Sequence, residues 1–109
     1  MIVAPTIGEM ARGVAAALED EAKWCTGAFA KDGNGFSVGA TSPRACKWCA
    51  EGHANRLYGE NRFALINAYA KHFNRESVAG DNDDREERGR LYVRDRLLEL
   101  AAFHEANHD

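Results

Sequence analysis

The sequence has no long apolar run, little proline and no excess of basic residues. No apolar stretch approaches the roughly 18–20 residues that a membrane-spanning helix requires, so we expect no membrane partner. Residues 1–6 lack the basic start and the apolar core of a signal peptide, which predicts a cytoplasmic protein. The net charge is −3, and without a basic excess we do not expect a nucleic-acid partner.

The length and composition are those of one small globular domain. The chain has 109 residues, of which 45% are hydrophobic and 28% are charged. A chain of this size buries roughly 60–70% of the surface that its unfolded state exposes, so it can fold alone. We therefore predict one helical domain over residues 1–109.

Apolar residues spaced by three or four positions predict two helices in the first half of the chain. The first is predicted over residues 7–30, with Thr6 as its cap and Glu9 as the partner in a capping box. The second is predicted over residues 43–57, because Ser42 followed by Pro43 is a strong start signal.

Two more helices are predicted in the second half. Asn61 can cap a helix over residues 62–75, whose broad apolar face is typical of a central helix. Residues 77–88 are predicted to be a long connection, and Gly89 makes the start of the last helix ambiguous. The apolar face of that helix is predicted to hold Val93, Leu97, Leu100, Ala101 and His104.

These patterns predict an all-α fold, a compact bundle of about four helices with two longer loops. Strand signals are almost absent. Residues 36–38 alone could form a short extended piece, inside the first of the two loops.

The cysteines raise the question of a metal site. Cys46, Cys49 and His53 have the spacing C-x-x-C-x-x-x-H, which on a helix places all three on one side. Thiolates and an imidazole suit zinc, and Cys25 would supply a fourth ligand. The same positions also form the apolar stripe of the predicted helix, and free cysteine packs as a small hydrophobe. Core packing is favoured, so no cofactor is predicted, with a zinc-stabilised domain as the alternative.

Residues 104–108 read H-E-x-x-H, the helical spacing of zinc proteases. The motif stands within the last six residues, where chains fray and no third ligand can follow. No other catalytic constellation is present, so the sequence favours a non-catalytic domain over an enzyme.

Four residues are the candidate binding residues. Asn82 and Asp83 belong to an oxygen-rich run that either caps the last helix or forms a ligand-binding or enzymatic site. Trp24 and Trp48 lie beside their apolar stripes, so each either closes the core or belongs to a partner-binding patch.

Charge is unevenly distributed along the chain. Residues 42–75 carry a net charge of +4, and residues 76–109 carry a net charge of −5. Either these regions are solvated faces that complement each other within the fold, or the first is a basic face for an acidic partner.

Several short motifs occur in a characteristic order over residues 8–103. They are Trp-Cys-Thr-Gly-Ala at 24–28, Ala-Lys-Asp-Gly at 30–33, Pro-Arg-Ala at 43–45, Trp-Cys-Ala-Glu-Gly at 48–52 and Val-Ala-Gly-Asp-Asn-Asp at 78–83. In this order the chain resembles a small domain-of-unknown-function family of actinobacteria and bacteriophages. It departs from that family at Asp81, where a tryptophan is usual, and of its cysteines Cys49 alone matches.

The resemblance implies no activity and no shared zinc site, and its phage distribution points to accessory roles. The leading hypothesis is therefore a non-catalytic helical interaction domain, encoded by a phage or mobile element and acting on a host protein. The sequence does not indicate the partner's identity or the oligomeric state.

Overall fold

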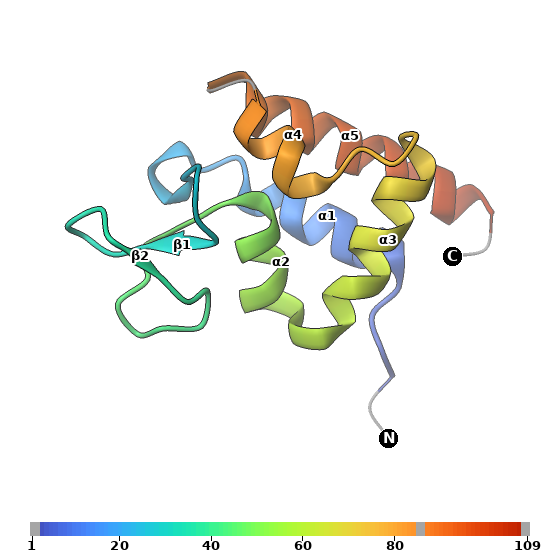
Figure 1. Cartoon of the computed structure of the whole chain (residues 1–109). Helices are drawn as coiled ribbons and strands as arrows, with labels where there is room; N and C mark the ends of the chain where they lie inside the picture. The colour runs from blue at the N-terminus through green and yellow to red at the C-terminus, as the bar shows by residue number, and fades with distance from the viewer. Residues whose placement is uncertain (1–2, 85–86, 108–109) are drawn as a thin grey trace.

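The residues that the structure describes form five α-helices and one small sheet. The computed structural model describes residues 3–84 and 87–107 (Figure 1). The helices are α1 (Ile7–Ala17), α2 (Ala50–Tyr58), α3 (Arg62–His72), α4 (Val78–Asp84) and α5 (Glu87–Ala106). The strands are β1 (Ala30–Lys31), β2 (Ser37–Val38) and β3 (Lys47–Trp48). The fold is thus mostly helical as predicted, but it is not all-α.

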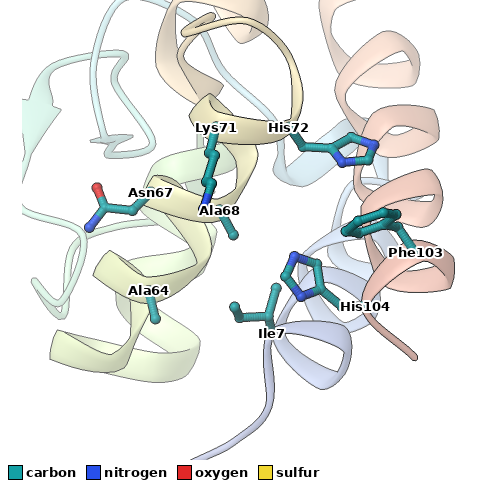
Figure 2. A pocket seen from close by; sticks show the side chains of 8 residues that line it. All are labelled: Ile7, Ala64, Asn67, Ala68, Lys71, His72, Phe103 and His104. Atoms are coloured by element: carbon teal, nitrogen blue, oxygen red, sulfur yellow. The ribbon is translucent and has the colours of Figure 1, made fainter. Parts of the chain in front are cut away.

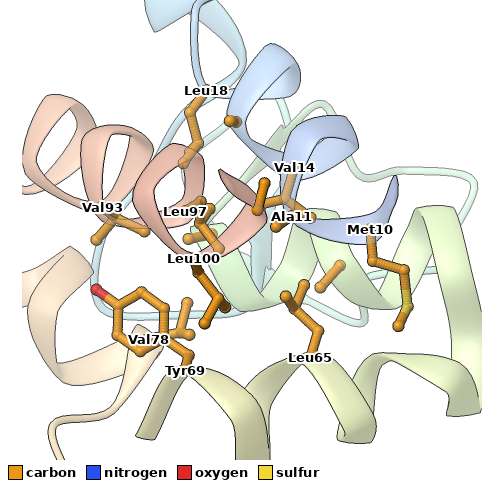
Figure 3. Packing of buried hydrophobic residues seen from close by; sticks show 14 residues of the cluster. Met10, Ala11, Val14, Leu18, Leu65, Tyr69, Val78, Val93, Leu97 and Leu100 are labelled. Carbon is orange, nitrogen blue, oxygen red and sulfur yellow. The ribbon is translucent and has the colours of Figure 1, made fainter. Parts of the chain in front are cut away.

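The core lies between α1, α3 and α5, which Figure 3 shows converging on one apolar cluster. The predicted apolar face of the last helix is confirmed, because its apolar members are fully buried: Val93, Leu97, Leu100 and Ala101. Burial of a leucine or valine side chain contributes roughly 1.5–3 kcal/mol, so this face holds much of the stability. At the rim, Arg12 of α1 donates two hydrogen bonds to the carboxylate of Glu105 of α5, at 2.7 and 2.6 Å.

The first helix is shorter than the predicted 7–30. It starts as predicted, since the Thr6 hydroxyl accepts a hydrogen bond from Glu9 N, but it ends at Ala17. The Asp20 side chain then accepts a hydrogen bond from Ala22 N and starts a single 3-10 turn, which competes with a continued helix. Beyond it, Cys25 N donates to the Trp48 carbonyl, so tertiary pairing overrides the helical spacing there.

The second helix starts later than the predicted residue 43. The Ser42 hydroxyl accepts a hydrogen bond from Arg44 N, as predicted for a cap, but the turn that it makes is local and leads into β3. The cap of α2 is Cys49, whose sulfur accepts a hydrogen bond from Gly52 N at 3.2 Å.

The third helix begins at Arg62 as predicted, but its predicted broad apolar face is not confirmed, since the buried residues of the helix are Leu65 and Tyr69. Asn61 makes no side-chain capping bond, and a 3-10 turn over Gly59–Asn61 leads into α3 instead. The helix ends at His72, and Asn74 and Arg75 then take left-handed backbone angles, with φ of 57° and 72°. These two residues reverse the chain before α4.

The predicted connection over residues 77–88 was wrong, because most of it is α4. The Ser77 hydroxyl accepts a hydrogen bond from Gly80 N and caps this seven-residue helix. Its sequence is too short and too polar for an apolar stripe to reveal it. Within it, only Val78 joins the apolar core cluster.

The three strands form an antiparallel sheet in the order β2-β1-β3. Ala30 pairs with Val38 and Trp48, and Lys31 pairs with Ser37 and Lys47. We call residues 28–48 the arm, because Figure 1 shows the strands and their loops on one side of the molecule, beyond α2. The short extended piece predicted at residues 36–38 is confirmed as β2.

None of the helices that the structure describes is both long and apolar enough to cross a bilayer.

Candidate functional site

Asn82 of α4 is the buried polar centre of the molecule. Its side-chain oxygen accepts hydrogen bonds from Trp24 Nε1 at 2.7 Å and from Ala50 N at 3.0 Å. Its side-chain nitrogen donates to the Cys25 carbonyl at 3.1 Å and to Asp83 Oδ1 at 2.9 Å. One amide thus holds together α4, the first turn of α2 and the segment that precedes the arm.

The neighbours of Asn82 extend this network. Asp83 Oδ1 also accepts a hydrogen bond from Gly27 N at 3.2 Å. On the other side, Asp81 Oδ2 accepts from the Tyr69 hydroxyl at 2.6 Å and from Arg96 at 3.1 Å. Burial, followed by the bond to Asp81, raises the pKa of Tyr69. The oxygen-rich run is therefore engaged in tertiary contacts, and Asn82 and Asp83 lie inside α4 rather than at the start of the last helix.

Of the four predicted binding residues, three share one hydrogen-bond network, and the backbone of the fourth, Trp48, forms a β-bridge with Trp24. Trp24, Asn82 and Asp83 meet in the network around the buried amide. Trp48 lies in β3, where its indole N–H donates to the Ala40 carbonyl at 2.9 Å. Binding by these four residues stays a prediction.

The Trp48 ring belongs to a second network, with His53 and Arg56 of α2. The Arg56 guanidinium lies 4.6 Å from the centre of the Trp48 ring, and its Nε donates to His53 Nδ1 at 2.9 Å. The other ring nitrogen of His53, Nε2, lies 3.1 Å from the Lys23 carbonyl. These partners assign a neutral imidazole whose proton is on Nε2.

Burial and the nearby Arg56 charge lower the pKa of His53 to about 4. The unfolded chain gives histidine a pKa near ~6.5, so between these values the unfolded state binds the proton and the folded state does not. We therefore expect the contribution of His53 to the free energy of unfolding to be complete above pH ~6.5. It should fall by up to about 3 kcal/mol as the pH drops toward ~4. Urea unfolding across this pH range measures the loss.

His53→Gln should make the free energy of unfolding nearly independent of pH over this range. His72→Gln removes a more accessible histidine and should leave the pH dependence as it is in the wild type. In the wild type, NMR should show that the His53 ring stays neutral as the pH falls below ~6.5. Parallel stability curves for the wild type and the His53 variant, or titration of His53 near its ordinary pKa, would contradict the expectation.

The cysteines do not share one face of a helix. Cys46 is exposed in the arm, where its thiol donates to the Lys31 carbonyl at 3.6 Å. Cys49 caps α2, and burial raises the pKa of its thiol to about 11. Cys25 is buried, with its thiol directed to the Ala28 carbonyl. Within residues 3–84 and 87–107, no three His, Cys, Asp or Glu side chains form a group that could hold a metal ion.

The structure describes the first part of the H-E-x-x-H motif, His104 and Glu105. Glu105 is engaged with Arg12, and His104 lies half-buried at the end of α5. His108 lies outside the described residues. In these contacts, Glu105 serves to join α5 to Arg12 of α1.

The arm carries two lysines, of which Lys47 belongs to the predicted basic region over residues 42–75 and Lys31 was not predicted. Lys31 of β1 pairs directly with Lys47 of β3, and side chains at paired positions share one face of an antiparallel sheet. Both line a hollow of about 450 Å³ together with Trp24 and Asp32. Asp32 Oδ1 accepts hydrogen bonds from Asn34 N and Phe36 N, both at 2.9 Å. Neither lysine forms an ion pair with a described residue.

Among the described residues, one contact between a basic and an acidic side chain joins the two oppositely charged regions of the chain, between His72 Nε2 and Glu99 Oε2 at 3.2 Å, and it is an ion pair only when His72 is protonated. The other ion pairs between described residues are Arg12–Glu105, Arg90–Glu21, Arg94–Glu19, Arg94–Asp95, Arg96–Glu76 and Arg96–Asp81. Among the described residues, the lysine and arginine side chains of residues 42–75 form no ion pair with the acidic region. A basic face for an acidic partner stays a prediction.

A separate pocket lies between the start of α1, α3 and the end of α5, and it is shown in Figure 2. It lies outside the arm and outside the network around Asn82.

Comparison with known proteins returned no matching family model, no matching curated protein and no matching solved structure.

Proposed function

We propose that this chain is a non-catalytic interaction domain whose arm binds an acidic surface of a partner protein. The observation that carries the proposal is the Lys31–Lys47 pair. Like charges directly opposite each other destabilise a sheet, and here no described carboxylate pairs with them. A carboxylate of a partner placed over the hollow would neutralise both ammonium groups at once.

The rest of the arm has the composition of an interface. Phe36, beside β2, is 69% exposed, and Arg44 is exposed in the loop before β3. Aromatic and arginine side chains are enriched in protein interfaces. The arm carries three basic side chains and one acidic one, whereas the whole chain carries −3. This contrast favours an acidic protein surface over a long nucleic acid, which would be repelled by the remaining charge. An accessory role on a host protein fits such a partner.

A charge reversal tests the proposal without knowledge of the partner. Lys31→Glu should raise the free energy of unfolding by roughly 0.5–1 kcal/mol, because it replaces a repulsive cross-strand pair by an attractive one. Lys47→Glu should do the same, and the double variant should return close to the wild type, since it restores a like-charge pair. Urea unfolding of the wild type, the two single variants and the double variant measures these changes in the free energy of unfolding.

Binding should change in the opposite direction to stability. A glutamate-rich peptide of roughly ten residues should bind the wild type, and Lys31→Glu should weaken binding by about tenfold or more. Arg75→Glu changes the net charge equally at an exposed residue outside the arm, and it should leave the affinity near that of the wild type. Equal losses in the two variants, or tighter binding of a short DNA duplex than of the peptide, would contradict the proposal.

A further inference from the structure

The pocket between α1, α3 and α5 has the size of a small-molecule site. Its volume is about 570 Å³, within the usual range of ligand pockets, roughly 300–1,000 Å³. The residues that line it are Ile7, Ala64, Asn67, Ala68, Lys71, His72, Phe103 and His104. Figure 2 shows Lys71 and Asn67 on the α3 side, with Ile7 and His104 across from them.

One wall of this pocket is a row of three rings. The His72 and Phe103 rings have centroids 4.8 Å apart, and the Phe103 and His104 rings have centroids 5.4 Å apart. Phe103 is 48% exposed although it is a large apolar side chain. A flat apolar ligand would cover this ring, and aromatic pairs gain free energy beyond the area that they bury.

The charge of Lys71 favours an anion in this pocket. Among residues 3–84 and 87–107 no carboxylate lines the pocket, and the carboxylate of Glu99 lies 3.2 Å from His72 Nε2. Lys71, at the C-terminal end of α3, has no ion-pair or side-chain hydrogen-bond partner among the described residues. Neither does the His104 ring, which lines the pocket from α5. Lys71 is exposed and His104 is half-buried, so both donors can reach the acceptor atoms of a ligand in the pocket.

We propose that this pocket binds a small aromatic carboxylate. The ring of the ligand would lie against Phe103, above the floor formed by Ile7 and Ala68. Its carboxylate would accept hydrogen bonds from the Lys71 ammonium and the His104 ring. This site is independent of the arm, so either proposal can fail without the other.

Naphthalene-2-carboxylate is a suitable probe, with the neutral naphthalene-2-carboxamide as its matched control. In an NMR titration of the whole chain, the carboxylate should shift the amide signals of Lys71, His72, Phe103 and His104. Lys71→Met should weaken binding by roughly tenfold, as expected for the loss of one charge-assisted hydrogen bond. Lys23→Met, which removes the same charge at an exposed residue outside both the pocket and the arm, should leave the affinity unchanged.

Ala64→Phe provides a second test, because residue 64 is exposed and a larger side chain there fills the pocket without entering the core. It should abolish the shifts at the pocket. Equal affinity for the carboxylate and the carboxamide, an unchanged affinity in Lys71→Met, or shifts centred on the arm would overturn the proposal. So would the absence of any shift at millimolar probe.

Discussion

Asn82→Ala is expected to lower the free energy of unfolding by about 3–5 kcal/mol. The substitution leaves the buried Ala50 N–H, the Trp24 indole N–H and the Cys25 carbonyl without their partner. Each unsatisfied buried group costs roughly 1–3 kcal/mol, and a domain of this size has only about 5–15 kcal/mol in total. The variant should therefore be largely unfolded under mild denaturing conditions.

Urea unfolding followed by circular dichroism measures this loss, and tryptophan fluorescence reports on Trp24 at the same time. Asn67→Ala is the matched control, because Asn67 is exposed on α3 and alanine favours a helix. It should unfold at the same urea concentration as the wild type or at a slightly higher one. A loss below about 1 kcal/mol in the Asn82 variant would show that water replaces the amide.

Gly52→Ala is expected to be comparably damaging, at about 3 kcal/mol or more, although alanine is the better helix former. A Cβ at this position would stand 1.9 Å from the Phe29 carbonyl oxygen and 2.9 Å from the Phe29 carbonyl carbon. Both are backbone atoms, so α2 and the arm would have to separate. The separation would strain the bond from Cys49 N to the same Phe29 carbonyl.

Gly13→Ala is the control for that prediction. Its Cβ would also meet an atom closer than 2 Å, but that atom is the Tyr58 hydroxyl at 1.8 Å, the end of a side chain that can rotate away. We expect a change within about 1 kcal/mol, because the gain in helix propensity offsets the displaced phenol. The urea midpoints of the two glycine variants test whether the backbone clash causes the loss of stability. Similar losses of stability in both variants would contradict that cause.

Sequence periodicity predicted the parts of the fold that apolar burial determines. The start of α1, most of α3 and the buried face of α5 follow from residues spaced by three or four positions. The sheet could not be predicted in this way, because strands of two residues show no alternation. α4 was missed for a related reason, since Asp81, Asn82 and Asp83 serve tertiary hydrogen bonds rather than an apolar face.

The candidate sites were only partly accessible from the sequence. Trp24 was predicted as a binding residue for one reason, and Asn82 and Asp83 for another. That they meet could not be predicted, because Trp24 and Asn82 are 58 positions apart in the chain. The pairing of Lys31 with Lys47 carries no sequence signal, because it exists only once β1 and β3 are aligned. The pocket likewise combines the start of α1 with the end of α5, which no local pattern reveals.

The pairing of α1 with α5 has a consequence for biosynthesis. The Arg12–Glu105 contact spans 93 residues, and the apolar face of α1 is covered mainly by the last helix. While the chain emerges from a ribosome, Met10, Val14 and Leu18 therefore stay exposed to chaperones until α5 has been synthesised. Because contacts so distant in sequence must close before the core forms, folding should begin late in translation and proceed more slowly than in bundles built from neighbouring helices.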